Sequence, residues 1–224
     1  MANNIDYYNI NAYEFFEGSV DADMSYWRER FLKYIPVGGR ILDAGCGSGR
    51  DSKAFIENGF SVVAFDASHE MCRLATDYLG QTVWQMRFDE MSFEDEFDGV
   101  WACASLLHVS DNEMDSVIAR LRDGLAYGGT LYASFKCGEE PAPVIGDTTD
   151  TAGTELVDAS TTAGAKSADA STIARGGRTF TNYTLEGLRK LFENAGFTIL
   201  ESDYSSDVRP GREKEQWVNV ICRK

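Results

Sequence analysis

Two carboxylates, each at the end of an apolar stretch, carry the strongest chemical signal in this sequence. Asp43 closes the first stretch and opens a loop in which every second residue is a glycine: Gly45, Gly47 and Gly49. Glycines permit positive φ angles and let a ligand approach the backbone closely, and the helix expected after the loop offers free N–H groups. Asp66 closes the second stretch, where a carboxylate can accept hydrogen bonds from both hydroxyls of a ribose. The pattern therefore predicts a site for a nucleoside.

The charge at the loop entrance separates two classes of nucleoside cofactor. A dinucleotide site has the spacing G-x-G-x-x-G, whereas this loop reads G-x-G-x-G. Asp43 would repel a pyrophosphate but attract a cation, and S-adenosylmethionine carries a sulfonium and an ammonium group without any phosphate. The two acids therefore predict S-adenosylmethionine as the cofactor. A nicotinamide-dependent oxidoreductase is disfavoured and stays as an alternative.

These motifs resemble those of class I S-adenosylmethionine-dependent methyltransferases over nearly the whole chain, apart from one insert. ILDAGCGSGRD resembles the glycine-rich motif, VVAFDAS the acidic-loop motif, FDGVWACASLLHV the fourth strand with its following motif, and LAYGGTLYASFK the fifth strand. The tail DVRPGREKEQWVNVICRK resembles small bacterial, tellurite-resistance-like methyltransferases. The resemblance implies an enzyme that transfers a methyl group; a non-catalytic cofactor-binding regulatory module is the second alternative.

The resemblance also implies which residues contact the cofactor. In this class the glycine loop meets the methionine part, the second acid the ribose, and the segment after the third strand the adenine. Met71 is expected to pack on adenine, and Asp89 to accept from its amino group beside the Phe88 ring, although Phe88 would serve equally as core. The full expected set is Asp43, Gly45, Cys46, Gly47, Gly49, Asp51, Asp66, Ala67, Ser68, Met71, Phe88, Asp89 and Ala104.

Methyl transfer from a sulfonium depends mainly on positioning the nucleophile, because the leaving group is already good. A general base is needed only where the nucleophile is protonated at rest. The resemblance places residues 104–108 beneath the sulfonium, so His108 is expected to orient the acceptor or take a proton. Tyr8 and Tyr13 are expected to line the methyl channel, where aromatic faces suit a cation. The alternatives are a packed or surface imidazole and hydrophobic docking of an N-terminal helix.

Four cations fall in segments that could reach the carboxyl edge of the sheet: Lys136, Arg178, Arg209 and Arg212. Together they predict a local pocket for an anionic acceptor, because arginine pairs with carboxylates and oxyanions through two parallel hydrogen bonds. The tellurite-resistance methyltransferases use arginines in the same half of the chain, although this sequence lacks their matching histidine. The alternative is ion pairing with nearby acids, namely Asp207, Glu213 and Glu215.

Composition narrows the class of partner. The 224 residues carry 36 acids against 21 Lys and Arg, for a net charge of −15, and no basic stripe, which disfavours a nucleic-acid substrate. Five scattered cysteines and two histidines form no metal-binding pattern. The first residues have no features of a signal peptide, and the longest apolar stretch, 99–109, is too short to span a bilayer. We therefore expect a cytoplasmic enzyme that methylates a small molecule, with no metal, membrane or nucleic-acid partner; the oligomeric state is left open.

Strand-like and helix-like segments alternate along the chain, which predicts an α/β fold. The expected architecture is a Rossmann-like, mostly parallel seven-stranded sheet with helices on both faces, in a single domain spanning residues 1–224. Segments 197–204 and 216–222 are expected to close the sheet as a C-terminal antiparallel hairpin. Ser68 and Thr184 are expected to cap helices.

One segment, residues 139–175, differs from the rest in composition. It is rich in Thr, Ala, Ser, Asp and Gly, with few large apolar residues. Such a segment buries little surface to offset the entropy of ordering, so we expect a flexible insert after the fifth strand. It is either a tolerated surface insertion or a lid over the substrate.

Overall fold

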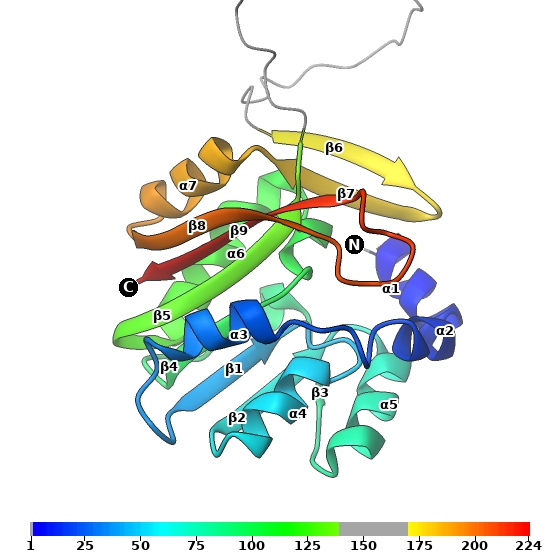
Figure 1. Ribbon diagram of the computed structural model, residues 1–224, viewed down its shortest axis with the longest axis horizontal. Helices are drawn as coiled ribbons and strands as arrows, with labels where there is room; N and C mark the ends of the chain where they lie inside the picture. The colour runs from blue at the N-terminus through cyan, green and yellow to red at the C-terminus, as the bar shows by residue number, and fades with distance from the viewer. Residues whose placement is uncertain (1, 139–169) are drawn as a thin grey trace, which may run out of the picture.

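The computed structural model describes residues 2–138 and 170–224, and it confirms the predicted fold class (Figure 1). Seven strands form one sheet in the order β3-β2-β1-β4-β5-β9-β8. The first five strands in this order pair in parallel, whereas β9 pairs antiparallel with both β5 and β8. The predicted C-terminal hairpin is therefore confirmed. The strand bounds are β1 Arg40–Ala44, β2 Ser61–Asp66, β3 Trp84–Gln85, β4 Phe97–Ala102, β5 Leu125–Lys136, β8 Thr198–Ser206 and β9 Gln216–Arg223.

Helices cover both faces of the sheet because neighbouring strand residues point to opposite sides. Ile41 and Val62 belong to a cluster with α3 and α4, and Ala64 packs with α5, whereas Leu42 and Val63 face the cluster of α6 and α7. Two short helices, α1 and α2, precede this core. The helix bounds are α1 Ala2–Ile10, α2 Ala12–Glu17, α3 Ser25–Leu32, α4 Arg50–Glu57, α5 His69–Leu79, α6 Asp111–Gly124 and α7 Leu185–Asn194, with 3-10 turns η1 Phe88–Glu90 and η2 Leu106–His108.

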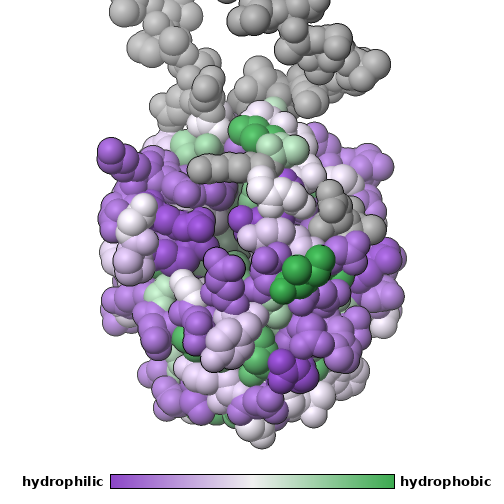
Figure 2. Space-filling view, turned by 90° about the vertical axis from the view of Figure 1, so that its right-hand side faces the viewer, coloured by the Kyte–Doolittle hydropathy of each residue, from purple (hydrophilic) through white to green (hydrophobic). Residues whose placement is uncertain are grey.

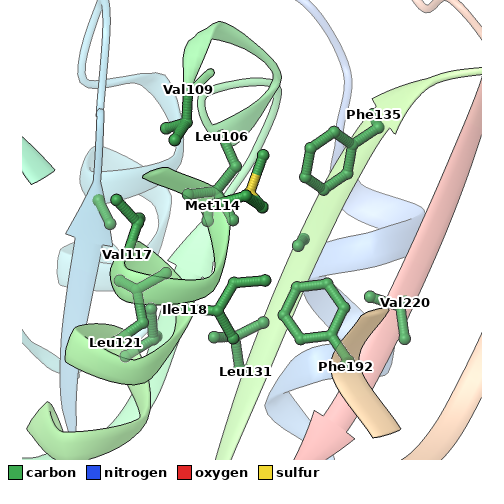
Figure 3. Packing of buried hydrophobic residues seen from close by; sticks show 14 of the residues in the cluster. Leu106, Val109, Met114, Val117, Ile118, Leu121, Leu131, Phe135, Phe192 and Val220 are labelled. Atoms are coloured by element: carbon green, nitrogen blue, oxygen red, sulfur yellow. The ribbon is translucent and has the colours of Figure 1, made fainter. Parts of the chain in front are cut away.

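The α6 side of the core is the larger one, and Figure 3 shows how it packs. Val117, Ile118 and Leu121 of α6 lie opposite Leu131 of β5, and Phe192 of α7 lies near Val220 of β9. The spacing of the α6 residues places them on one helical face. Burial of this apolar surface fixes the carboxyl ends of β4 and β5 relative to each other, and the site is built there.

Two helix caps appear where the sequence predicts them. The Ser68 hydroxyl accepts a hydrogen bond from the Met71 N–H at the start of α5, and the Thr184 hydroxyl accepts one from the Gly187 N–H at the start of α7. Each cap satisfies one of the N–H groups that have no partner within a helix. The Ser68 cap also fixes the chain just after Asp66.

The predicted insert extends too far toward the C-terminus, because its last six residues are ordered. Residues 170–175 form a strand, β6 (Ala170–Arg175), which pairs antiparallel with β7 (Arg178–Tyr183) in a separate two-stranded sheet. Gly176 and Gly177 both have positive φ angles and form the turn between these strands, as two-residue hairpin turns require. The rest of the segment, residues 139–169, lies outside the described residues. The assignment of the whole chain to one domain stays a prediction.

Within the described ranges, 2–138 and 170–224, every helix falls short of the length and apolar character needed to cross a membrane.

Candidate functional site

A large open cavity lies at the carboxyl ends of β1, β2 and β4, with about 1560 Å³ of empty space when its mouth is included. Residues of α1, β7 and the loop between β8 and β9 also line it. Figure 1 shows α1 and the β8–β9 loop at the same edge of the sheet. Figure 2 views the molecule from that direction and shows a hollow that is surrounded largely by hydrophilic side chains. Open α/β sheets bind ligands at this edge.

Most of the predicted cofactor residues meet at one end of this cavity. Nine of them line it: Gly45, Cys46, Gly47, Asp66, Ala67, Ser68, Met71, Phe88 and Ala104. The structure places the other four, Asp43, Gly49, Asp51 and Asp89, outside the lining. Gly49 is the residue that precedes α4, and its φ angle is +78°.

Asp66 ties the glycine loop to the end of β2. Its carboxylate accepts hydrogen bonds from the Gly47 N–H at 3.0 Å and from the Ser68 N–H at 2.8 Å. Burial raises the pKa of Asp66, and the N–H groups of Ser68, Gly47 and Ala67 counteract that rise. Each carboxylate oxygen accepts one of these hydrogen bonds and keeps a further lone pair for a ligand donor. This geometry suits the predicted contact with ribose hydroxyls.

Ala104 closes the floor of the cavity in a strained conformation. Its φ angle is +52°, which a residue with a Cβ rarely adopts. A left-handed conformation of this kind costs on the order of 1–2 kcal/mol. The Ala104 N–H donates to the Ser134 hydroxyl at 2.9 Å, which holds the strained turn in place. Such strain is concentrated at functional sites.

Asp43 lies beneath the glycine loop and does not line the cavity. It is buried, and the Ser52 hydroxyl donates to its Oδ2 at 2.6 Å. Burial and the nearby Asp51 carboxylate raise the pKa of Asp43 to about 7. A direct contact between this side chain and the methionine part of a cofactor is therefore not supported, although its charge is close to the loop.

The raised pKa of Asp43 predicts a pH-dependent stability. The ordinary carboxyl pKa is 3.8 and the folded value is about 7, so between these values the folded state binds more protons than the unfolded state. The penalty for burying this charge thus grows as the pH rises from about 4 to about 7. Asp43→Asn retains an oxygen for the Ser52 hydroxyl and removes the charge. We expect the stability of the variant, measured by urea unfolding, to rise relative to that of the parent as the pH increases from 5 to 8. A difference between variant and parent that stays constant over this range would contradict the raised pKa of Asp43.

Asp51 forms a buried ion-pair centre, which corrects the prediction that it contacts the cofactor. Its carboxylate accepts hydrogen bonds from Arg28 at 2.7 Å, from Arg50 at 2.5 and 3.1 Å, and from the Trp101 indole at 3.0 Å. Burial alone would raise the pKa of Asp51, but the two guanidinium groups outweigh it and lower the pKa. Arg50 itself lines the cavity. Asp51 therefore positions a cation at the cavity wall.

The neighbouring residues Asp89 and Phe88 differ in whether they face the cavity. Asp89 is exposed and pairs with the neighbouring Arg87, so the expected contact with the adenine amino group is not made by a side chain facing the cavity. Phe88 does line the cavity, and its ring packs edge-on against Phe65 at 5.5 Å between centroids. Phe88 thus belongs both to the wall and to the core, so the two interpretations offered for it are compatible.

Tyr8 and His108 meet in the other half of the cavity. The Tyr8 Oη lies 2.9 Å from His108 Nε2, and His108 Nδ1 lies 3.1 Å from the Thr179 carbonyl oxygen. Burial is the largest cause that lowers the pKa of His108 to about 4, with smaller contributions from Arg178 and Lys136. Burial likewise raises the pKa of Tyr8. Both groups are therefore neutral at neutral pH.

Tyr13 is not part of this group. Its side chain is 65% exposed and lies outside the cavity lining, whereas Phe15, two residues later, lines it. Residues two apart in a helix point to nearly opposite sides, so α2 can present only one of these two rings. Phe15 packs against Tyr8 at 4.9 Å between ring centroids. The aromatic ring that α2 contributes to the cavity wall is thus Phe15, and the predicted Tyr13 is not part of the wall.

Two asparagines, which the sequence analysis did not identify, hold α1 over the cavity. The Asn4 side chain bonds both backbone groups of Thr179, accepting from its N–H at 2.8 Å and donating to its carbonyl at 3.2 Å. Asn9 accepts from the Ser68 hydroxyl at 2.8 Å. These contacts join α1 to β7 and to the start of α5, so Tyr8 lies between two anchors. No local sequence signal marks the Asn4–Thr179 pair, which spans 175 residues.

All four predicted substrate-binding cations line the cavity, but three of them are paired. Lys136 and Arg212 pair with Glu215, and Arg209 pairs with the buried Asp207. Arg178 differs, because no carboxylate lies within ion-pair distance of it among the described residues. Its Nη1 lies 3.3 Å from the Tyr8 Oη, and its guanidinium lies over the Tyr7 ring at 4.4 Å. The pairing alternative is therefore realised for three residues and not for Arg178.

Comparisons with known proteins agree with this geometry. A family model described as a methyltransferase domain matches residues 41–129. A ubiquinone biosynthesis O-methyltransferase of Xanthomonas axonopodis pv. citri is 31% identical over 115 residues, which cover 46% of this chain and 47% of that protein. The putative methyltransferase YqeM of Bacillus subtilis is 29% identical over 124 residues, covering 50% of each chain. The chain thus spans about half the length of the curated relatives that it matches.

Solved structures show the same fold over more of the chain. The 1,6-didemethyltoxoflavin-N1-methyltransferase of Burkholderia thailandensis, solved with 1,6-didemethyltoxoflavin and S-adenosylhomocysteine, has a TM-score of 0.75 at 19% identity, covering 100% of this chain and 88% of that one. An S-adenosylmethionine-dependent methyltransferase of Mesorhizobium loti has a TM-score of 0.64 at 18% identity, covering 93% and 100%. The narrower resemblance to tellurite-resistance-like enzymes stays a prediction. The chain carries the fold of class I S-adenosylmethionine-dependent methyltransferases, as its motifs predict, and its residues 41–129 match the methyltransferase domain model.

Proposed function

We propose that this protein transfers the methyl group of S-adenosylmethionine to a small-molecule acceptor that carries an anionic group. The observation that carries the proposal is that two groups of residues line one and the same cavity, and we assign each group to one half of it. The glycine loop and Asp66 form one half, and Tyr8, His108 and the cation cluster form the other. A methyl group passes directly between the two ligands only if both occupy the same water-excluding space.

The cofactor half offers a contact for each part of S-adenosylmethionine. Asp66 would accept from the ribose hydroxyls, and Met71 and Phe88 would enclose the adenine. Arg50, held by Asp51, lies at the wall near Gly47 and Ser48, where a guanidinium would pair with the methionine carboxylate. The cofactor supplies an electrophilic methyl group on its sulfonium; the protein orients it and keeps water away.

The charge of the acceptor half supports an anionic acceptor. Four cations line this half, and three of them pair with the two carboxylates Asp207 and Glu215, so positive charge exceeds negative charge locally among the described residues. The whole chain has a net charge of −15 and repels anions at long range. An acid would therefore be held by these fixed local cations. The Xanthomonas and Burkholderia proteins support a small acceptor, since their names state ubiquinone biosynthesis and 1,6-didemethyltoxoflavin.

The cofactor site is tested by replacing Asp66. Asp66→Ala removes a charged acceptor of ribose hydroxyls, and hydrogen bonds to charged groups are worth roughly 1.5–3 kcal/mol. We expect the affinity for S-adenosylhomocysteine, measured by calorimetry, to fall about 10-fold or more. Asp77→Ala on the exposed face of α5 is the matched control and should bind normally, because its side chain is 73% exposed. Unchanged affinity in Asp66→Ala would overturn the ribose assignment.

The same titrations separate the two alternatives. Preferential binding of NADH would favour an oxidoreductase. Binding of S-adenosylmethionine without transfer to any carboxylate, oxyanion, amine or thiol would favour a non-catalytic regulatory module. Transfer of a labelled methyl group to an acid would support the proposal.

A further inference from the structure

The hydrogen-bond directions around His108 are fixed by a backbone carbonyl. The Thr179 oxygen can only accept, and it lies 3.1 Å from His108 Nδ1, so Nδ1 carries the proton. The Asn4 amide nitrogen also lies near Nδ1, at 3.4 Å, and would favour the other tautomer. That tautomer would set a nitrogen lone pair against the carbonyl oxygen, and the Asn4 amide already donates to the same carbonyl at 3.2 Å. The Thr179 contact therefore decides the tautomer.

This tautomer determines what Tyr8 offers to a ligand. His108 Nε2 is then a bare acceptor, so the Tyr8 hydroxyl 2.9 Å away donates its only proton to it. The Tyr8 oxygen keeps two lone pairs, and Arg178 Nη1 approaches one of them at 3.3 Å. Toward the cavity, Tyr8 is consequently a hydrogen-bond acceptor. It would bind an O–H or N–H donor and would repel an anion.

Arg178 offers the complementary group beside it. Its guanidinium carbon lies over the ring of Tyr7, at 4.4 Å, and over that of Phe180, at 5.1 Å, so two aromatic contacts hold the group in place. Its buried Nε has no hydrogen-bond partner among the described residues. Lys136, Arg209 and Arg212 already face carboxylates, whereas no carboxylate of residues 2–138 or 170–224 pairs with Arg178. A cation and a hydrogen-bond acceptor therefore lie 3.3 Å apart at the cavity wall.

We infer that the acceptor is an acid whose nucleophilic hydroxyl or N–H group lies beside its anionic group. The inference rests on the proposed function and specifies its substrate class. The anionic group binds Arg178, and the adjacent nucleophile donates its hydrogen bond to Tyr8. The short separation between Arg178 and Tyr8 requires the two groups of the acceptor to lie within a few bonds of each other, as in a 2-hydroxy or 2-amino acid or an ortho-hydroxybenzoate.

The same contacts provide a path for the proton. A lone pair of the nucleophile attacks the methyl carbon, the carbon–sulfur bond breaks, and its electron pair stays on the sulfur of S-adenosylhomocysteine. The proton of the nucleophile passes to the Tyr8 oxygen while the Tyr8 hydroxyl proton passes to His108 Nε2. One positive charge leaves the sulfonium and one appears on the imidazole, so charge is conserved. Tyr8 is the catalytic residue in this step, and His108 positions it and receives the proton through it.

The test measures transfer of a labelled methyl group to matched sets of acceptors. One set holds acids with an adjacent hydroxyl or amino group, such as 2-hydroxybenzoate and 2-hydroxy acids. The second holds isomers in which the groups are separated, such as 4-hydroxybenzoate, and the third holds the neutral amides or esters. We expect kcat/KM to be at least about 10-fold higher for the adjacent set, because only these acids engage both groups.

Variants identify the residues that make this selection. Tyr8→Phe should lower kcat for the adjacent acids by about 100-fold or more, as loss of a proton acceptor does, with affinity for S-adenosylhomocysteine and melting temperature preserved. His108→Gln should lower kcat with little change in KM, whereas Arg178→Lys should chiefly raise KM for the acid. Tyr13→Phe, on the exposed face of α2, is the control and should leave all values unchanged.

The outcomes separate this inference from the proposed function. Absence of transfer to every acceptor in all three sets would overturn the function itself. Transfer that favours separated or neutral acceptors, or full activity in Tyr8→Phe, would overturn the inference and leave the methyltransferase function standing. If His108→Gln lowers kcat and also lowers the melting temperature, His108 has a structural role.

Discussion

Replacing Asp51 with asparagine should lower the free energy of unfolding by about 3–5 kcal/mol, which is the usual cost of breaking a buried ion pair from one side. Asp51 is 4% exposed, and its carboxylate receives hydrogen bonds from Arg28, Arg50 and Trp101. An asparagine of the same shape keeps one accepting oxygen but turns an NH₂ group toward a donor. Two guanidinium groups would then lose their shared counter-charge in a poorly hydrated region.

Urea unfolding at pH 7 measures this effect, with Asp77→Asn as the control. Asp77 forms an exposed pair with Arg73 at 3.6 Å, so its replacement should change stability by less than about 1 kcal/mol. The folded pKa of Asp51 lies below its ordinary value of 3.8. The stabilisation is therefore present above that value and is lost as the pH falls through the lower, folded pKa. A change of similar size in both variants would show that the buried pairs contribute little.

The same substitution bears on the site, because Asp51 positions Arg50. Without the carboxylate, the Arg50 guanidinium is free to leave the cavity wall, and we expect weaker binding of S-adenosylhomocysteine in the folded variant. Asp51 entered the sequence analysis as a cofactor contact because it follows the glycine loop. The structure places it outside the cavity lining, because Arg28 and Trp101 bind it from α3 and β4, and no local pattern encodes such contacts.

Local signals account for most of the fold that could be predicted. The Ser68 and Thr184 caps and the two strands of the C-terminal hairpin depend on residues close together in the sequence. The β6–β7 hairpin was missed because its first strand is built from small and polar residues, whose composition indicates a loop. Pairing with β7 supplies the backbone hydrogen bonds that stabilise it, and that pairing is invisible in composition.

The site divides in the same way. Asp66 and the glycine loop act through bonds between residues less than 20 positions apart, and spacing alone places them together. The cation cluster required a long-range prediction, which brought Arg178 and Arg209 to the right cavity. The sequence does not reveal which of these arginines form ion pairs, because the Arg209–Asp207 pair depends on the conformation of the β8–β9 loop. Only the structure shows that Arg178 contacts the Tyr8 hydroxyl and meets no carboxylate among the described residues.

Gly45→Ala should combine two separate penalties at the centre of the cofactor site. Gly45 has a φ angle of +80°, and a Cβ there would lie 2.6 Å from the Cβ of Ser105. The left-handed backbone costs about 1–2 kcal/mol for alanine. The clash adds about 1–3 kcal/mol, as overpacking generally does, because Ser105 is held in place by its hydrogen bond to the Ala44 carbonyl at 2.7 Å.

Comparison with Gly59→Ala separates the cost of the clash from the cost of the left-handed backbone. Gly59 has a φ angle of +85° but no atom within 4 Å of a Cβ built there, so its replacement incurs the backbone cost alone. We expect Gly45→Ala to be less stable than Gly59→Ala by about 1–3 kcal/mol in urea unfolding, and to bind S-adenosylhomocysteine more weakly, whereas Gly59→Ala binds normally. Equal stability and equal affinity in the two variants would mean that the loop relaxes away from Ser105. In that case the glycine is required at position 45 for its φ angle, and the close approach of the loop to Ser105 does not shape the cofactor site.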